Sequence, residues 1–400
     1  MLTFAGKALE AVTTLRDGTH RTATLEQTWA RFAPAAKRAG ITRIAELTGL
    51  DTLGIPVFAA VRPLGRSLST QQGKGITPLA AKVSALMESL ETWTAEQAIP
   101  TRRGSYRQLR GPRLRGAAIN ARARPIDVRA LPRPRGRLDL DARWRWIEGR
   151  DLVTDTPVLV PFESVTLDTV FTRPPVFDIS STGLASGNVL AEAILHGLCE
   201  VLERDAEAAW RRSGGDRRLV LDTIDSPICR MLIDQIVATG ARVFVWDLGA
   251  TDVAAIGCAI LEDPREPSWR DLGCYQGFGA HLVPEVAIAR AVTEAAQTRL
   301  TYIAGARDDF FPADYAQATD REVLLELWER LAAPCDEPVV FDDLPRFEAP
   351  SLGRGLTALV ERVIGTGGQV IVVDLTHPEL RVPVVKVLVP GRATDLEALG

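Results

Sequence analysis

The sequence predicts a mixed α/β fold in which helices cover mixed sheets. Runs of apolar or β-branched residues alternate along the chain with longer segments whose apolar residues recur every three or four positions. The chain has 400 residues, of which 46% are hydrophobic. That is enough to bury a large core. We expect residues 1–400 to form a single domain with two intertwined subdomains rather than two independent ones.

The expected elements follow from these patterns. Short apolar runs bounded by turn residues predict strands, several of them buried, at Val57–Val61, Arg218–Leu221, Val243–Trp246, Ile256–Leu261, Gln369–Val373 and Val382–Val389. Amphipathic segments predict helices near residues 25–39, 78–96, 188–212, 226–238, 284–301, 320–332 and 351–365. This alternation is typical of sheets covered by helices.

The interval 101–150 differs from the rest of the chain. It is rich in arginine and contains Pro112, Pro125, Pro132 and Pro134. We interpret it as an irregular excursion that leads into a strand at Arg143–Ile147. Its arginines could contact an acidic partner, or they could form an ordinary solvated charged surface.

Composition excludes several classes of protein. A net charge of −4 argues against strong non-specific binding of nucleic acid. No run of 18 apolar residues predicts a membrane helix, and the N-terminus lacks the features of a signal peptide, so we expect a cytoplasmic protein. The five cysteines are scattered without a C-x-x-C pair, so neither a disulfide framework nor a zinc site is predicted.

Two predicted helices each carry carboxylates along one face. At the helical spacing, Ser84, Glu88 and Glu91 fall within about 60° of one another, while Asn188, Glu192, Glu200 and Glu203 fall within about 120°. These two sets are called the acidic stripes below. Like charges at these spacings repel, and the second stripe has no Lys or Arg before Arg204 to relieve the repulsion.

The acidic stripes have two interpretations. Each helix alone could be amphipathic with a solvated acidic side, because Leu190, Ile194, Leu198 and Val201 form an apolar face opposite the second stripe. Together, carboxylates with an amide and without His or Cys at ligand spacing favour Mg²⁺, which prefers oxygen ligands and bridges to phosphate. We therefore expect the two stripes to converge around a magnesium-bound nucleotide.

Other nucleotide motifs and hydrolase motifs are absent from the sequence. Gly73-Lys74-Gly75 lacks the Ser or Thr that follows the Lys of a P-loop. Gly273, Gly277 and Gly279 do not have the G-x-G-x-x-G spacing, and we expect them to end a strand. The four histidines do not form a metalloprotease helix, and no G-x-S-x-G is present. His196 lies on the acidic side of its helix, where it could be a packing residue or could bond a carboxylate or substrate.

The joint pattern resembles the YcaO family, ATP-dependent enzymes that activate backbone amides of peptides. The resembling segments include Gln72-Gly-Lys-Gly75, the first stripe, Gly183-Leu-Ala-Ser-Gly-Asn188, and Glu200-Val-Leu-Glu-Arg-Asp205. The likeness continues in two later segments, Gly279-Ala-His-Leu-Val-Pro-Glu-Val-Ala and Arg290-Ala-Val-Thr-Glu-Ala-Ala-Gln-Thr-Arg299. It covers nearly the whole chain and is weakest at 101–150.

The resemblance implies a site for ATP and Mg²⁺ between the two acidic helices. The implied metal ligands are Glu88, Glu91, Glu192, Glu200 and Glu203. The implied nucleotide-binding residues are Arg21, Thr28, Lys74, Ser84, Asn188 and Arg204, with Arg21 and Thr28 matching the family's N-terminal spacing only loosely. The implied catalytic arginines, which would hold the phosphate, are Arg204 and one of two late positions, Arg299 or Arg307.

The resemblance also implies a reaction. Cyclodehydratases of the family form azolines and commonly end in a Pro-rich tail, which residues Arg392–Gly400 do not show. Three segments resemble those of members that work with a TfuA-type partner: Gly40–Asp51, Gly54-Ile-Pro-Val and Val382-Pro-Val-Val-Lys-Val. Those members form thioamides with an external sulfide donor, on a peptide or protein substrate, and a homodimer is implied. Azoline formation, macroamidine formation and a nucleotide-binding scaffold without turnover remain alternatives.

Overall fold

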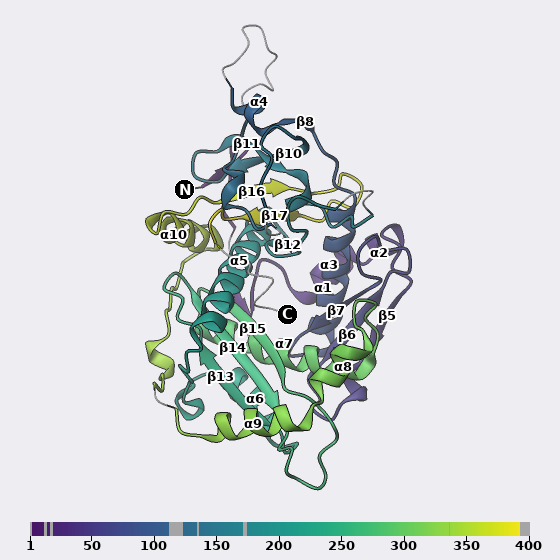
Figure 1. The fold of residues 1–400 in the computed structure, drawn as a ribbon, viewed down its shortest axis with the longest axis vertical. Helices are drawn as coiled ribbons and strands as arrows, with labels where there is room; N and C mark the ends of the chain where they lie inside the picture. The colour runs from purple at the N-terminus through teal and green to yellow at the C-terminus, as the bar shows by residue number, and fades with distance from the viewer. Residues whose placement is uncertain are drawn as a thin grey trace.

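The computed structural model describes residues 2–11, 14–16, 19–111, 123–133, 136–170, 174–335 and 337–392. In Figure 1 the larger sheet lies in the upper part of the molecule and the sheet β13–β15 in the lower part, and the long helix α5 runs between them. Helix α3 stands beside α5. Residues 112–122 and 134–135 of the Arg/Pro-rich interval, and residues 393–400, where no Pro-rich tail is expected, lie outside the described residues.

The first unit is an antiparallel sheet of β5 (Arg43–Glu46), β6 (Val57–Val61) and β7 (Thr70–Lys74), covered by α3 (Pro78–Glu96). The glycine of β7 lets the helix approach closely. A Cβ on Gly73 would lie 1.9 Å from the backbone nitrogen of Ala85, so only glycine fits. This contact fixes the face of α3 that turns away from the sheet.

The expected helix at 25–39 is divided in two. Helix α1 (Leu25–Phe32) has the side chain of Thr24 as its N-cap, and α2 (Ala35–Arg38) follows Pro34. Proline has no backbone N–H and its ring restricts the preceding residue, so one helix does not continue through it.

A second unit has the same order of elements. Strands β13 (Arg242–Asp247), β14 (Ala254–Leu261) and β15 (Tyr275–His281) form an antiparallel sheet, followed by α7 (Pro284–Ala304). Alternate residues of β14 serve two cores: Ile256 and Ile260 pack with α7 and α6 (Pro227–Val237), while Ala255 and Ala259 pack with α5. A sheet buried on both faces explains the continuous apolar run of β14.

The larger sheet brings together distant parts of the described chain. Its order is β12 (Leu184–Ser186), β17 (Val384–Leu388), β16 (Ile371–Asp374), β10 (Arg143–Asp151), β11 (Thr156–Pro161) and β9 (Arg124–Pro125), and β8 (Arg102–Ser105) also pairs with β10. All pairs are antiparallel except β9 with β11. Helix α5 (Leu190–Ser213) packs against β12 and β17.

The remaining elements are shorter or peripheral. They are the hairpins β1–β2 (Thr3–Phe4, Lys7–Ala8) and β3–β4 (Thr14–Arg16, Thr19–Arg21), and the helices α4 (Tyr106–Arg110), α8 (Pro312–Ala318), α9 (Arg321–Ala332) and α10 (Leu352–Gly365). No helix in the described ranges is long and apolar enough to cross a membrane.

Most of the expected elements are confirmed, and one strand prediction is wrong. Arg218–Leu221 forms only isolated bridges, from Arg218 to Trp246 and from Leu219 to Val339. A short 3-10 helix begins at Leu221, so the run is too short to extend either ladder. The strand expected at Arg143–Ile147 is present and longer, and Gly277 and Gly279 lie within β15 rather than at its end.

Candidate nucleotide and metal site

The first acidic stripe lies on α3, whose start is set by its sequence. Thr77 caps the helix by accepting a hydrogen bond from the Ala80 N–H at 3.2 Å, and Pro78 occupies the first turn, where no N–H partner is needed. Leu86 and Leu90 are buried in a core on one side. Glu88 and Glu91 point away from this core and are only half-buried by exposed area.

The second stripe lies on α5. Its apolar residues Ile194, Leu198 and Val201 pack into the main core, which orients the opposite side of the helix toward α3. On that side Glu203 is 1% exposed, and its Oε2 accepts the backbone N–H of Ala280 in β15 at 2.7 Å. Helix α5 ends at Gly214, which adopts the left-handed conformation (φ 64°) that favours glycine.

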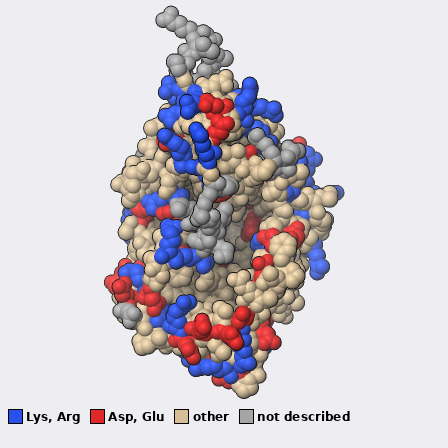
Figure 2. All heavy atoms as spheres, viewed as in Figure 1, with Lys and Arg blue, Asp and Glu red and all other residues tan. Residues whose placement is uncertain are grey.

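The structure brings the two stripes together. Burial raises the pKa of Glu91 well above its usual value, and the carboxylate of Glu200, on the other helix, raises it further, as does that of Glu88. Burial likewise raises the pKa of Glu88 and that of Glu200 to about 7. Although these side chains are partly exposed, burial is the largest cause of the rise in their pKa values. Figure 2 shows a hollow near the middle of this face, with acidic side chains on its wall.

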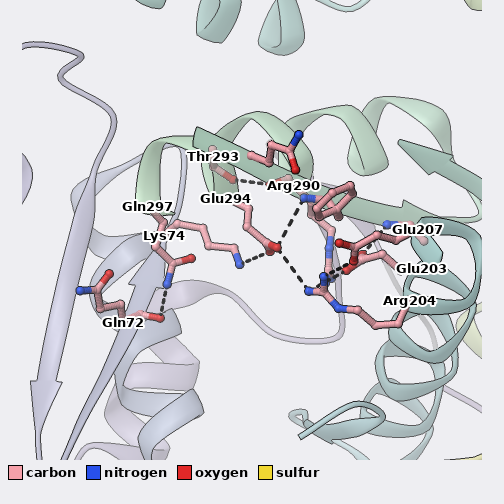
Figure 3. A network of polar contacts seen from close by, with 12 residues as sticks. Gln72, Lys74, Glu203, Arg204, Glu207, Arg290, Thr293, Glu294 and Gln297 are labelled. Carbon is pink, nitrogen blue, oxygen red and sulfur yellow. Dashed lines mark hydrogen bonds and ion pairs between the residues drawn. The ribbon is translucent and has the colours of Figure 1, made fainter. Parts of the chain in front are cut away.

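Lys74 and Arg204 partly compensate these charges. Lys74 Nζ lies 2.7 Å from Glu294 Oε2, and Arg204 Nη2 lies 3.3 Å from Glu294 Oε1 and 3.3 Å from Glu203 Oε1. Figure 3 shows both cations pointing toward Glu294 from opposite sides. Burial would raise the pKa of Glu294, but these cations outweigh it and lower that pKa to about 2. Glu294 is therefore ionised.

Glu192 has a different environment from the other predicted ligands. Its carboxylate accepts hydrogen bonds from Arg21 Nη1 at 3.0 Å, from the N–H and hydroxyl of Thr22 at 3.0 and 2.7 Å, and from Asn188 Nδ2 at 3.2 Å. Burial opposes ionisation of Glu192, but Arg21 and the Thr22 bonds outweigh it and lower the pKa. Glu192 thus joins the N-terminal segment to the start of α5.

The N-terminal residues Arg21 and Thr28 reach this second stripe. Thr28 is buried, and its hydroxyl donates to Asn188 Oδ1 at 3.0 Å. Arg31 Nη1 donates to the backbone oxygen of Asn188 at 2.9 Å. The predicted nucleotide-binding residues Arg21, Thr28 and Asn188 therefore form one connected group at the beginning of α5, whereas Ser84 lies one turn before Glu88 on α3.

The two late arginines lie in different places. Arg299 is fully buried, and its guanidinium is paired with Asp51 at 2.7 Å and with Glu262 at 2.6 Å. The structure therefore does not bring Arg299 to the acidic stripes. Arg307 is paired with Asp309, and its charge also reaches Glu88, where it opposes the rise in pKa that burial causes. Of the two positions, Arg307 is the one beside the acidic stripes.

Two charged residues beside the acidic stripes are not predicted from the sequence. Lys386 is 3% exposed in β17, and although burial lowers its pKa to about 8, Glu200 and Glu91 act in the opposite direction. A single lysine inside the apolar run Val382–Val389 was the available signal. Glu294 could have been found from Arg290-x3-Glu294, which places both residues on one face of α7.

Two buried nitrogen atoms near the stripes have no partner among the described residues. They are Nδ1 of His196, which lies one turn from both Glu192 and Glu200, and Nε of Arg290. Burial lowers the pKa of His196 well below its usual value, and the charge of Arg290 lowers it further. Buried polar groups normally have hydrogen-bond partners. These atoms fit a site that receives a polar ligand.

The donor set fits magnesium together with a nucleotide. Carboxylate oxygens are the ligands that Mg²⁺ prefers, and burial together with neighbouring carboxylates raises the pKa of Glu91, Glu88 and Glu200. Within the described ranges, no three His, Cys, Asp or Glu residues are arranged to hold a metal ion alone. Mg²⁺ commonly takes one or two carboxylates and completes its shell with phosphate and water. Fold and site thus define a protein that binds a magnesium–nucleotide complex.

Comparison with known proteins supports this class. The family described as YcaO cyclodehydratase, ATP- and Mg²⁺-binding, matches residues 72–393, and the chain belongs to the YcaO family. A protein in the tfuA 3′ region of Rhizobium leguminosarum bv. trifolii is 36% identical over 408 residues, with 98% of this chain and 93% of the relative covered. A Mycobacterium tuberculosis H37Rv protein is 36% identical over 392 residues, with 94% of this chain and 83% of that protein covered.

Solved structures agree with the fold. YcaO from Methanopyrus kandleri bound with AMPPCP and Mg²⁺ has a TM-score of 0.72 at 28% identity, covering 96% of this chain and 95% of that chain. A heterocyclase in complex with substrate and cofactor has a TM-score of 0.75 at 24% identity. The match covers 94% of this chain, which spans about half (53%) of that heterocyclase. ATP and Mg²⁺ are the cofactors of the family.

Proposed function

We propose that this chain phosphorylates the oxygen of a peptide backbone amide at the expense of ATP and so prepares the amide for conversion to a thioamide. The observation that carries the proposal is the convergence of Glu88, Glu91 and Glu200 from two helices, with pKa values raised by burial and mutual repulsion. Such a cluster requires cations, and YcaO proteins are ATP-dependent enzymes that modify peptides.

The proposed roles follow from the geometry. Glu88, Glu91, Glu200 and Glu203 would hold magnesium, and bound magnesium would neutralise charge on the triphosphate. Arg204 and Arg307 would contact phosphate oxygens beside the acidic stripes. Lys74 would exchange its partner Glu294 for phosphate. Arg21, Thr28, Ser84 and Asn188 would contact the nucleotide, with Glu192 fixing Arg21 and Asn188 in place rather than serving mainly as a ligand.

Amide activation explains why the site contains charges and not a nucleophile. Resonance makes the amide carbon a poor electrophile. Transfer of the γ-phosphoryl group to the amide oxygen breaks the bond to the leaving ADP and turns that oxygen into a good leaving group. Hydrosulfide then attacks the carbon, phosphate departs with the oxygen, and loss of the sulfur proton leaves C=S. The protein contributes positioning and electrostatic stabilisation.

Sulfur as the incoming atom is supported by the relatives. The Rhizobium protein, 36% identical, lies in the tfuA 3′ region, which agrees with the TfuA-type segments in this sequence. We therefore propose that a TfuA-type partner and a sulfide donor act with this chain, on a peptide or protein substrate. A homodimer is part of the same proposal.

The test combines the purified chain, its TfuA-type partner, ATP, Mg²⁺, sulfide and a peptide substrate, and measures the peptide by mass spectrometry. The expected product has one oxygen replaced by sulfur. Loss of one water would support azoline or macroamidine formation instead. Absence of peptide-stimulated ATP hydrolysis would indicate a nucleotide-binding scaffold and overturn the proposal. Glu91→Gln is the negative control, because it removes a charge from the centre of the site.

A further inference from the structure

Arg204 is held from outside the acidic stripes by Glu207, which is 1% exposed and lies three residues later on α5. Glu207 Oε2 accepts a hydrogen bond from Arg204 Nη1 at 2.7 Å. Its other oxygen accepts two bonds from Arg211, from Nε at 3.1 Å and from Nη2 at 3.0 Å. One buried carboxylate therefore joins two arginines on the same helix.

Strand β15 completes this arrangement. Arg211 Nη2 also donates to Gln276 Oε1 at 2.9 Å, which ties the end of α5 to the strand. The guanidinium carbons of Arg204 and Arg211 lie 5.8 and 5.4 Å from the ring centre of Phe278. Both arginines thus contact one aromatic ring, within the range of a cation–π interaction. Figure 3 shows Arg204 between Glu207 and Glu294.

The contacts of Arg204 are unequal. Its bond to Glu207 is 2.7 Å, whereas its distances to Glu203 and Glu294 are 3.3 Å. Guanidinium groups prefer close, bidentate contact with one carboxylate. Without Glu207, Arg204 would turn toward Glu203 or Glu294 and neutralise a carboxylate that the site needs. With Glu207, one amino group of Arg204 is fixed and the other remains at the edge of the acidic stripes.

We infer that Glu207, itself held by Arg211, is a positioning residue that directs the Arg204 guanidinium toward the bound triphosphate. The inference rests on the proposed function for the phosphate contact of Arg204. Glu207 acts through Arg204 and touches neither nucleotide nor peptide. Its effect must therefore disappear when Arg204 is absent.

The experiment measures the dissociation constant of AMPPCP with Mg²⁺ by calorimetry, in the full chain. Glu207→Gln should weaken binding about tenfold, because a charge-assisted bond is replaced by a weaker neutral one. Arg204→Gln should weaken it at least as much. The double variant should bind no more weakly than Arg204→Gln alone. Glu326→Gln, an exposed substitution on α9, is the matched control and should bind as the unmodified chain does.

Other outcomes decide between the possible failures. Additive losses in the double variant, or unchanged binding in Glu207→Gln, would overturn the positioning role. If Glu207→Gln does not fold, Arg211→Lys replaces it and should weaken binding only when Arg204 is present. The peptide assay is separate: nucleotide binding that depends on Glu207 through Arg204 can stand even if thioamidation fails. An unmodified chain that does not bind AMPPCP would overturn both proposals.

Discussion

The ammonium group of Lys74 lies 2.7 Å from the carboxylate of Glu294, and this ion pair joins β7 of the first unit to α7 of the second. Burial raises the pKa of Glu88 on α3, and Lys74 opposes that rise; Lys74 also contributes to ionising Glu294. One lysine therefore counters acidic groups from two different helices. In the absence of magnesium, the charge of Lys74 reduces the cost of these buried carboxylates to the stability of the fold.

Lys74→Gln should make the chain more dependent on magnesium for stability. Loss of the ammonium leaves the carboxylates of Glu88 and Glu294 less compensated, so the Tm in EDTA should fall by several degrees. Because added Mg²⁺ restores positive charge, the rise in Tm on adding Mg²⁺ without nucleotide should be larger in the variant than in the unmodified chain. Scanning calorimetry with and without ligand measures this. An equal rise in both proteins would contradict the compensating role.

Glu91→Gln should stabilise the ligand-free chain while abolishing its activity. The pKa of Glu91 is raised well above normal by burial and by Glu200. At neutral pH this carboxyl ionises freely in the unfolded chain but not in the folded chain, and that difference costs stability. The neutral amide removes that cost, and the Tm in EDTA should rise. ATP hydrolysis should fall on the order of 100-fold or more, because charge stabilisation in the transition state is lost. A lower Tm in EDTA would show that Glu91 is structurally required.

The stabilisation produced by Glu200→Gln should depend on pH. The folded pKa of Glu200 is about 7, above the usual 4.5. The native state therefore binds more protons than the unfolded state between these values. The contribution of this carboxyl to the free energy of unfolding is lost as the pH rises from 4.5 through 7. The Tm advantage of Glu200→Gln in EDTA should be largest near pH 8, shrink as the pH falls toward 4.5, and vanish below that value. Comparing the two proteins at each pH cancels contributions from His196 and His281. A constant difference would contradict the raised pKa.

Arg299→Gln and Arg307→Gln should separate structural from functional arginines. Arg299 is fully buried between Asp51 and Glu262, so its loss leaves buried charge unpaired and should cost about 3–5 kcal/mol of stability. Arg307 pairs with Asp309 at a partly exposed position, so its loss should leave the Tm nearly unchanged while raising the KM for ATP. Urea unfolding and steady-state kinetics measure the two effects. A KM effect confined to Arg299→Gln would reverse the assignment.

Elements with a clear apolar period could be predicted from the sequence, and those without one could not. Helices α3 and α5 were predicted with their acidic stripes because their apolar faces recur at helical spacing. Strand β7 reads Thr-Gln-Gln-Gly-Lys and shows no apolar alternation, since Gly73 meets a helix and its polar neighbours bond to α7. Gly277 and Gly279, which meet α7, likewise interrupt the apolar alternation of strand β15.

The site was predicted in part. The two carboxylate stripes could be recognised because each lies on one helix, where spacing determines the face. Residues that join the site from strands could not be recognised in this way. Lys386 reaches it through the pairing of β17 with β12, and Glu207 matters through a bond to Arg204 that no spacing distinguishes from an ordinary surface pair. Choosing Arg307 over Arg299 required knowing that Asp51 lies beside Arg299.

Strand β7 also has a consequence for ion selectivity. It packs on α3 through Gly73 and is bonded to α7 through Lys74–Glu294 and through Gln72, which accepts from Gln297 at 2.8 Å and from Thr301 at 2.6 Å. These bonds hold α3 close to α7. The bond of Glu203 to the Ala280 N–H of β15, against which α7 packs, holds the carboxylates of α5 to the same framework. Calcium, with its larger ionic radius and six to eight ligands, needs a site that can widen, whereas magnesium fits a fixed one. We expect the chain to discriminate against calcium through this rigidity.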